Sequence, residues 1–152
     1  MDQRPRILVV EDGHEYIEAF TRYLGEEFDF VRAGNGFDAL DQLSAEEWHA
    51  VFLDMRFDRA DRLLGDLDAL ELRFHGDRSR AKRFVEDNQG TYIAAAIRSA
   101  GYVHPLLFSY DFDSEPRRLA HLRERYSPLS YIGDTAGPAE IREAIWGLWA
   151  TD

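Results

Sequence analysis

Two apolar runs of the sequence end abruptly in acidic residues. Residues 6–12 read RILVVED, and residues 51–56 read VFLDMR. A short apolar run of this kind is typical of a buried parallel strand, and open α/β sheets bind ligands outside the carboxyl ends of their strands. If the two strands lie side by side, the carboxylates of Glu11, Asp12 and Asp54 meet at one edge. Hard divalent cations prefer oxygen ligands, so the sequence predicts a cation site there.

The elements that would position these acids alternate between strand and helix along the chain. Strands are expected at residues 6–10, 28–32, 50–54, 104–109 and 129–132. Helices are expected at 13–24, from 37 to before Trp48, at 91–100, after a cap at Ser114, and from Pro138 through Trp149. This alternation predicts an α/β fold, in which helices cover both faces of a parallel sheet.

Residues 57–89 interrupt this regularity. The segment is too long for an ordinary connection of about 2–6 residues, so we expect an insertion within a single domain spanning 1–152. Leucines at helical spacing predict one amphipathic helix over 63–72, and a second is expected at 81–85. Between Arg56 and Asp87, eight acidic and eight basic residues cancel, so the net charge of -11 belongs to the remaining scaffold.

Composition excludes several classes of function. A net charge of -11 over 152 residues repels phosphate backbones and anionic lipids, so nucleic acid and membrane surfaces are not expected partners. The chain has no cysteine, which removes disulfides and thiolate sites, and its five histidines show no metal-ligand spacing. No apolar run is long enough to span a bilayer, and no separate output domain is expected. We therefore expect a cytoplasmic protein.

Four segments, in order, resemble strands of the receiver domain of bacterial response regulators: RILVVED, FLDMR, LLFSY and LSYIG. The resemblance implies a doubly wound, flavodoxin-like sheet of five parallel strands in the order 2-1-3-4-5. It also implies that Asp54 accepts a phosphoryl group, and that Glu11, Asp12, Asp54 and the Arg56 backbone carbonyl hold Mg²⁺. A hard cation would offset the repulsion between a carboxylate nucleophile and a phosphoryl group.

Two further roles follow from the same resemblance. Ser109 would hydrogen-bond the phosphoryl oxygens, and Tyr131 would be the switch aromatic whose burial changes with Ser109. The implied partner is a protein, either a histidine kinase or a downstream effector, and a homodimer stays open. No enzyme activity is expected beyond phosphorylation and dephosphorylation of the aspartate itself.

The sequence departs from the receiver pattern at one position that matters for chemistry. The family has a lysine three positions after the switch aromatic, followed by a proline, whereas this chain has Asp134 and Thr135. The single lysine, Lys82, lies in the insertion. A fourth carboxylate near Asp54 would raise the electrostatic cost of adding a phosphoryl group.

Two explanations of this departure stay open. The insertion folds back and supplies a substitute cation from its basic tract, Arg78, Arg80, Lys82 and Arg83. Alternatively, the domain no longer works as a phosphorylation switch and binds its partners constitutively. The second explanation is simpler because it requires no new chemistry.

Structural roles compete with each functional interpretation. Glu11 and Asp12 also fit a helix cap, Ser109 a strand-end turn, Tyr131 core packing, and Asp134 a solvated turn. The sequence thus leaves a cation-binding receiver that accepts phosphate on Asp54, and a pseudo-receiver acting as a protein-interaction module. Nucleases of the Toprim type and haloacid-dehalogenase-like phosphatases fit poorly, because the triplet at Asp54 lacks a second aspartate.

Overall fold

The computed structural model describes residues 3–150, and its centre is a parallel sheet of five strands. The strands are β1 (Arg6–Val10), β2 (Asp29–Ala33), β3 (Ala50–Asp54), β4 (Leu106–Ser109) and β5 (Leu129–Ile132). They lie in the order β2-β1-β3-β4-β5, which confirms the predicted fold class and strand order. Strand β4 begins two residues later than predicted, directly after Pro105, which has no N–H to donate to a ladder.

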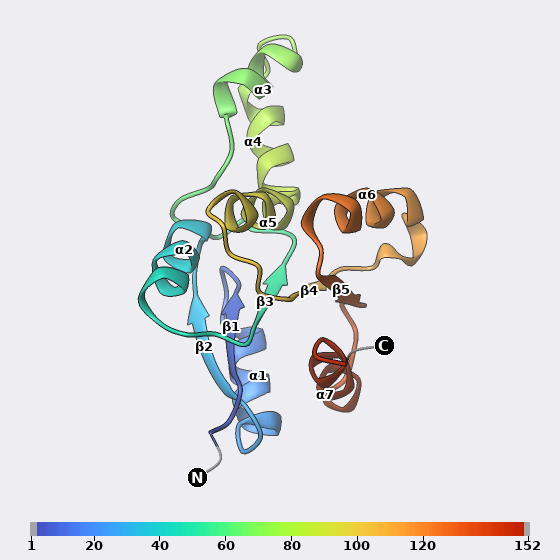
Figure 1. Cartoon of the computed structure of the whole chain (residues 1–152). Coiled ribbons are helices and arrows are strands. Elements are labelled where there is room, and N and C mark those ends of the chain that lie inside the picture. Colours follow the sequence, from blue (N-terminus) through green and yellow to red (C-terminus); the bar gives the residue numbers. More distant parts are fainter. Residues whose placement is uncertain (1–2, 151–152) are drawn as a thin grey trace.

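Helices cover both faces of this sheet (Figure 1). They are α1 (Glu15–Leu24), α2 (Gly36–Ala45), α3 (Leu67–Arg73), α4 (Arg78–Asp87), α5 (Gln89–Ser99), α6 (Pro116–Tyr126) and α7 (Pro138–Gly147), with a short 3-10 helix η1 (Phe112–Ser114) before α6. Within residues 3–150, no helix is both long and apolar enough to cross a lipid bilayer.

Alternating side chains of the strands divide the core in two. Ile7 and Val9 of β1 pack with α1 and α7 on one face, whereas Leu8 and Val10 pack with α2, α5 and α6 on the other. Each central strand is therefore apolar on both sides, which is why the sequence reads as continuous apolar runs instead of alternating ones. The acids stand where these runs end.

Several helix boundaries differ from the sequence prediction, three of them for a visible reason. Ser114 lies in η1, and Glu115 occupies the position before α6, so the predicted serine cap is wrong. Helix α7 ends at Gly147, which leaves Trp149 beyond it. The helix predicted over 63–72 begins only at Leu67, because Gly65 has a φ of +127°, a left-handed conformation that a helix cannot contain.

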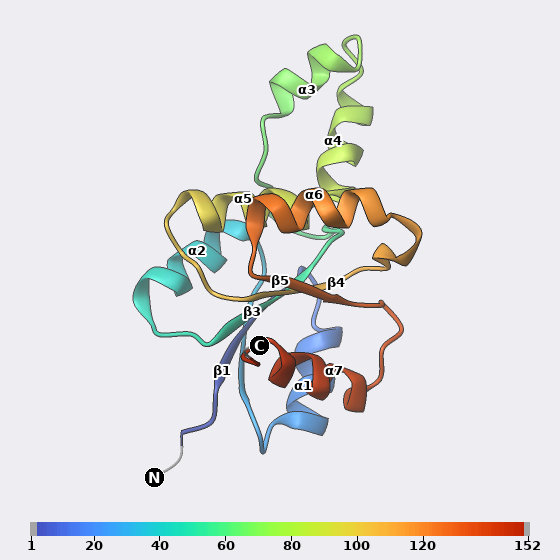
Figure 2. The same cartoon turned by 45° about the vertical axis from the view of Figure 1, so that its right-hand side comes forward.

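The insertion forms a helical hairpin that extends beyond the sheet (Figure 1 and Figure 2). Helices α3 and α4 bury Leu70, Ala81 and Val85 against each other in a small cluster of their own. Hydrogen bonds anchor the base of the hairpin. The Phe57 N–H donates to the Glu86 carbonyl (2.8 Å), and the buried Gln89 side chain bonds both the N–H and the carbonyl of Leu64.

Helix α5 crosses close to the end of β3, and a glycine allows this approach. The Gly90 N–H donates to the Met55 carbonyl (2.9 Å), and a Cβ atom at Gly90 would lie 2.5 Å from the Asp54 carbonyl oxygen and 2.9 Å from Met55 Cα. Both obstacles are backbone atoms, which cannot rotate away. The site around Asp54 thus depends on a residue without a side chain.

We predict that Gly90→Ala lowers the free energy of unfolding by about 1–3 kcal/mol, because either α5 or the end of β3 must shift. Urea unfolding followed by tryptophan fluorescence measures this loss. Gly147→Ala is the matched control, since nothing lies within 4 Å of a Cβ atom there. Equal stability of the two variants would contradict the proposed close approach.

Candidate functional site

Strand register brings the predicted acids to one edge of the sheet. Val10 of β1 pairs with Leu53 of β3, so the residues that follow, Glu11 and Asp54, leave their strands at the same level. Asp54 also pairs with Ser109 of β4. The Glu11 residue and the Asp12 side chain are 1% and 2% exposed, which means that this edge holds carboxyl groups largely shielded from water.

The Glu11 carboxylate caps α1. Its two oxygens accept hydrogen bonds from the backbone N–H groups of Tyr16 (3.1 Å) and Ile17 (2.7 Å). His14, at the N-cap position, makes no such bond with its side chain, so Glu11 supplies it from the preceding loop. Burial raises the Glu11 pKa and these two bonds lower it, with burial the larger effect. The helix-cap interpretation left open by the sequence describes Glu11 correctly.

Asp12 is held by an arginine that the sequence analysis did not single out. The Arg59 backbone N–H donates to Asp12 Oδ2 (2.6 Å), and the Arg59 guanidinium lies 3.7 Å from Asp12 Oδ1. The same guanidinium makes two hydrogen bonds to Glu15, at 2.8 and 3.3 Å. It lies over Gly13, where a Cβ atom would collide with it. Arg59 therefore brings a positive charge from the insertion to the acidic edge.

The pKa of the Asp54 carboxyl is strongly raised. Its pKa is raised to about 7, first because the carboxyl is desolvated and then because Asp12 and Glu11 are close by. A hydrogen bond from the Met55 N–H to Asp54 Oδ1 (2.9 Å) and the charge of Arg59 oppose this rise without cancelling it. Asp12 and Glu11 thus both act on Asp54, as sharing a single edge requires.

Tyr16 joins this edge from α1. Its hydroxyl lies 2.7 Å from Ser109 Oγ, and its ring packs against Phe52 with centroids 5.0 Å apart. Burial raises the Tyr16 pKa, and the charges of Asp54 and Asp134 raise it further. The sequence predicts only that Tyr16 lies in the helix expected at 13–24. One signal in the sequence could have indicated that Tyr16 belongs to the site: it lies in the first turn of the helix that follows the acidic end of the first strand.

The remaining predicted residues lie around this edge. The Tyr131 hydroxyl donates to Asp113 of η1 (2.6 Å), and its ring packs edge-on against Phe112. Asp134 is exposed in the turn after β5 and lines a depression with Tyr16 between α1 and α7. The Arg56 side chain is exposed and pairs with Asp87 at 3.2 Å, which ties the end of β3 to the end of α4.

The basic tract of the insertion serves the hairpin. Arg78 pairs with Asp68 (3.0 Å) and Glu71 (2.9 Å), and the Arg80 guanidinium lies over the Phe74 ring. The tract that was expected to fold back over Asp54 thus makes its contacts within the hairpin, and the cation at the acidic edge is a different residue. That residue is Arg59, which lies much closer in sequence to Asp54.

Magnesium is poorly matched by the donors as they are arranged. Within residues 3–150, no group of three or more histidine, cysteine, aspartate or glutamate side chains is placed to hold a metal ion. Both oxygens of Glu11 accept backbone N–H groups, and Asp12 is bonded to Arg59. Mg²⁺ demands near-octahedral oxygen ligands, and these carboxylates do not provide them together. The predicted Mg²⁺ site at Glu11, Asp12, Asp54 and the Arg56 carbonyl stays a prediction that this geometry does not favour.

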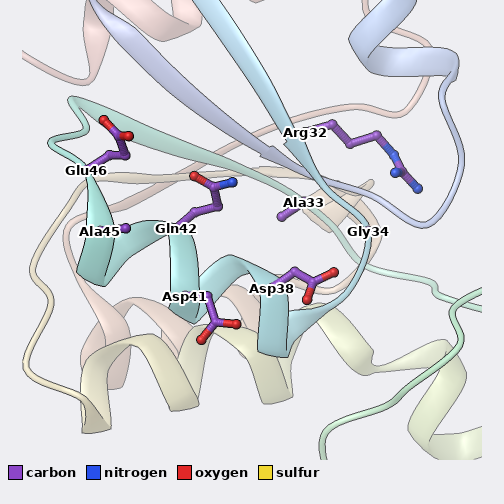
Figure 3. Close-up of a pocket in the computed structure, with 8 residues that line it drawn as sticks. All are labelled: Arg32, Ala33, Gly34, Asp38, Asp41, Gln42, Ala45 and Glu46. Atoms are coloured by element: carbon purple, nitrogen blue, oxygen red, sulfur yellow. The ribbon is translucent and has the colours of Figure 1, made fainter.

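A separate depression of about 510 Å³ lies between β2 and α2 (Figure 3). Carboxylates of Asp38, Asp41 and Glu46 line it, and Arg32 stands at the end opposite Glu46. The Arg32 guanidinium donates to the carbonyls of Gly13 (2.5 Å) and Asp12 (2.9 Å), and so braces the loop after β1. This depression adds no residue to the site around Asp54.

Solved structures share this architecture. The chain aligns with the receiver domain of a Francisella response regulator at a TM-score of 0.65 and 14% identity, over 95% of this chain and 96% of that one. A signal receiver domain of an HD domain-containing protein from Pseudomonas fluorescens Pf-5 gives 0.66 and 13%, over 97% and 88%. The chain has a receiver-like fold.

A third structure is named as an adenylate cyclase from Rhodopirellula baltica, with a TM-score of 0.64 and 16% identity over 96% of this chain and 87% of that chain. No protein-family model matches the sequence, and no curated protein matches it. At such low identities the likeness establishes the fold, while the chemistry must be argued from the residues.

The Asp54 carboxyl should make stability depend on pH. Its pKa rises from 3.8 to about 7 on folding, so the folded state binds more protons between these values and stability falls as pH rises through that window. At about pH 8, Asp54→Asn should be more stable than the wild type by on the order of 2 kcal/mol, and at about pH 4 the difference should shrink toward zero.

Urea unfolding at a series of pH values measures this difference. Asp41→Asn, at an exposed position of α2, is the control and should stay within about 0.5 kcal/mol of the wild type throughout. If the gain of Asp54→Asn is the same at both ends of the pH range, Asp54 does not carry the raised pKa.

Proposed function

We propose that this chain is a receiver-like signalling domain that works as a protein-interaction module independently of phosphorylation. The observation that carries the proposal is the position of the Arg59 guanidinium at the acidic edge, 3.7 Å from Asp12 and 2.8 Å from Glu15. The Arg59 guanidinium, which is part of the chain, lies where a receiver-type phosphorylation site would need an exchangeable divalent cation. The edge is thereby partly neutralised without any added ion.

The groups that would receive a phosphoryl group support the same conclusion. Asp54 has a pKa of about 7, so near neutral pH a large fraction of it is protonated and a poor nucleophile. The Ser109 hydroxyl already shares a hydrogen bond with Tyr16. Asp134 stands where the resemblance implies a lysine and adds negative charge. Each of these features disfavours a dianionic phosphoryl group at Asp54.

The second candidate is a domain of two-component type that binds Mg²⁺ and accepts phosphate on Asp54 from a histidine kinase. One observation favours it: Asp54 and Ser109 are directly paired across β3 and β4, with Glu11 and Asp12 close by. In that case Arg59 would have to leave Asp12 when the ion binds. The two candidates make opposite predictions for the same measurements.

Incubation with Mg²⁺ and acetyl phosphate should leave the wild-type mass unchanged, because a large fraction of Asp54 is protonated near neutral pH and Arg59 already pairs with the acids at this edge. Intact-mass spectrometry checks this result, with an established receiver domain treated in parallel to show that the donor is active. A phosphoryl adduct on the wild type that Asp54→Asn abolishes would establish the second candidate instead.

Removal of the Arg59 guanidinium should open the edge to metal. We expect Arg59→Ala to bind Mg²⁺ at least about tenfold more tightly than the wild type, since Asp12 and Glu15 lose the cation that neutralises them. Isothermal titration calorimetry measures both affinities. Arg62→Ala is the control, because Arg62 belongs to the same loop but pairs with Asp38. Tight Mg²⁺ binding by the wild type would contradict the role given to Arg59.

A further inference from the structure

The hairpin adds a wall to a groove on the helical face that carries α5 and α6. The groove has a volume of about 420 Å³ and is lined by α4, α5 and α6; in both views α4 rises above the layer that α5 and α6 form (Figure 1 and Figure 2). Its apolar lining comes from Phe84 of α4, Tyr92 of α5, and Leu122 and Tyr126 of α6. Phe84 is 39% exposed, which is high for a phenylalanine beside other aromatic rings. The groove therefore offers an unfilled aromatic surface.

Arginines stand around this apolar lining. Arg73 and Arg125 both line the groove and are exposed, and within residues 3–150 neither forms an ion pair with a carboxylate. Arg118 lies deeper and is held by Asn88 Oδ1 (2.6 Å) and the Tyr110 hydroxyl (3.1 Å). Arg73 and Arg125 thus keep their hydrogen-bonding capacity for a ligand.

This positive charge contrasts with the rest of the molecule. Helix α6 contains four arginines and one glutamate, in a chain of net charge -11. Such a separation of charge is an electrostatic mark of a binding face, because complementary potentials guide a partner to one surface. A partner drawn to this face must carry negative charge and avoid the acidic surfaces elsewhere.

We propose that this groove binds an acidic segment of a partner protein that contains aromatic or leucine side chains. Arginine forks pair well with carboxylates, and aromatic side chains supply most of the anchoring energy of protein interfaces. A nucleic acid fits less well. Its phosphate backbone has no apolar groups to fill the apolar lining of the groove, and the net negative charge of the chain repels it. The proposal rests on the proposed function and names the surface and the chemistry of its partner.

Peptide selection tests this proposal without knowledge of the partner. A phage library of random 16-residue peptides is panned against the full chain, and the most enriched peptide is titrated by fluorescence polarisation. We expect aspartate and glutamate to be enriched together with phenylalanine, tryptophan or leucine. Failure to enrich any peptide, or enrichment of peptides without acidic residues, would overturn the proposal.

Variants locate the binding surface. The double variant Arg73→Glu with Arg125→Glu should weaken the selected peptide at least about tenfold, and Phe84→Ala should weaken it by several fold. Arg83→Glu is the control for charge, since Arg83 is an exposed residue of α4 that does not line the groove. Circular dichroism and urea unfolding confirm that each variant is folded. Equal losses in the Arg83 variant and the double variant would overturn the groove as the site.

The same measurements separate this proposal from the proposed function. If the variants at Arg73, Arg125 and Phe84 bind the peptide as tightly as the wild type, the groove is rejected. The proposed function then stands, with the partner bound at another surface. Binding at the groove that occurs only after Asp54 is phosphorylated rejects phosphorylation independence and keeps the groove. A dimer in light scattering that the double variant dissociates identifies a second copy of the chain as the occupant, which overturns the partner proposed here.

Discussion

Carboxyl groups gathered at one edge of a sheet repel one another, and burial removes the water that would screen them. In this molecule the cost is met in three ways. Glu11 accepts two backbone N–H groups at the start of α1, Asp12 pairs with Arg59, and Asp54 has its pKa raised to about 7. The parallel register of β1 and β3 forces these groups together, so the loops that follow each strand must carry the compensating donors.

The insertion is part of this compensation. Arg59 belongs to the loop that leaves β3, and the base of the hairpin is fixed by the bond between Phe57 and Glu86 and by the pairing of Arg56 with Asp87. Electrostatics at the strand edge and the placement of α3 and α4 are therefore connected through a few residues. The same hairpin brings Phe84 and Arg73 beside α5 and α6. One inserted segment thus shapes both the acidic edge and the basic groove.

The core shows why the sheet could be predicted so closely. Val51, Phe52 and Leu53 are fully buried because helices cover both faces, and a run of this kind has no other stable environment in a chain of this size. The bounds of β1, β3 and β5 agree with the prediction to the residue. Helix ends were harder to predict. Ser114 lies in η1 and does not cap α6, and the left-handed backbone of Gly65 delays the start of α3 to Leu67.

The sequence by itself determined the order of strands and helices, the insertion, and the acids at the strand ends, because local periodicity and abrupt changes in polarity are written in neighbouring residues. Tertiary structure alone decided which cation meets those acids and which hydroxyl meets Ser109. Arg59 lies 47 residues from Asp12, and Tyr16 lies 93 residues from Ser109. No local pattern distinguishes Arg59 from the other arginines of the insertion. Only the direction in which the chain leaves β3 places it at the acidic edge.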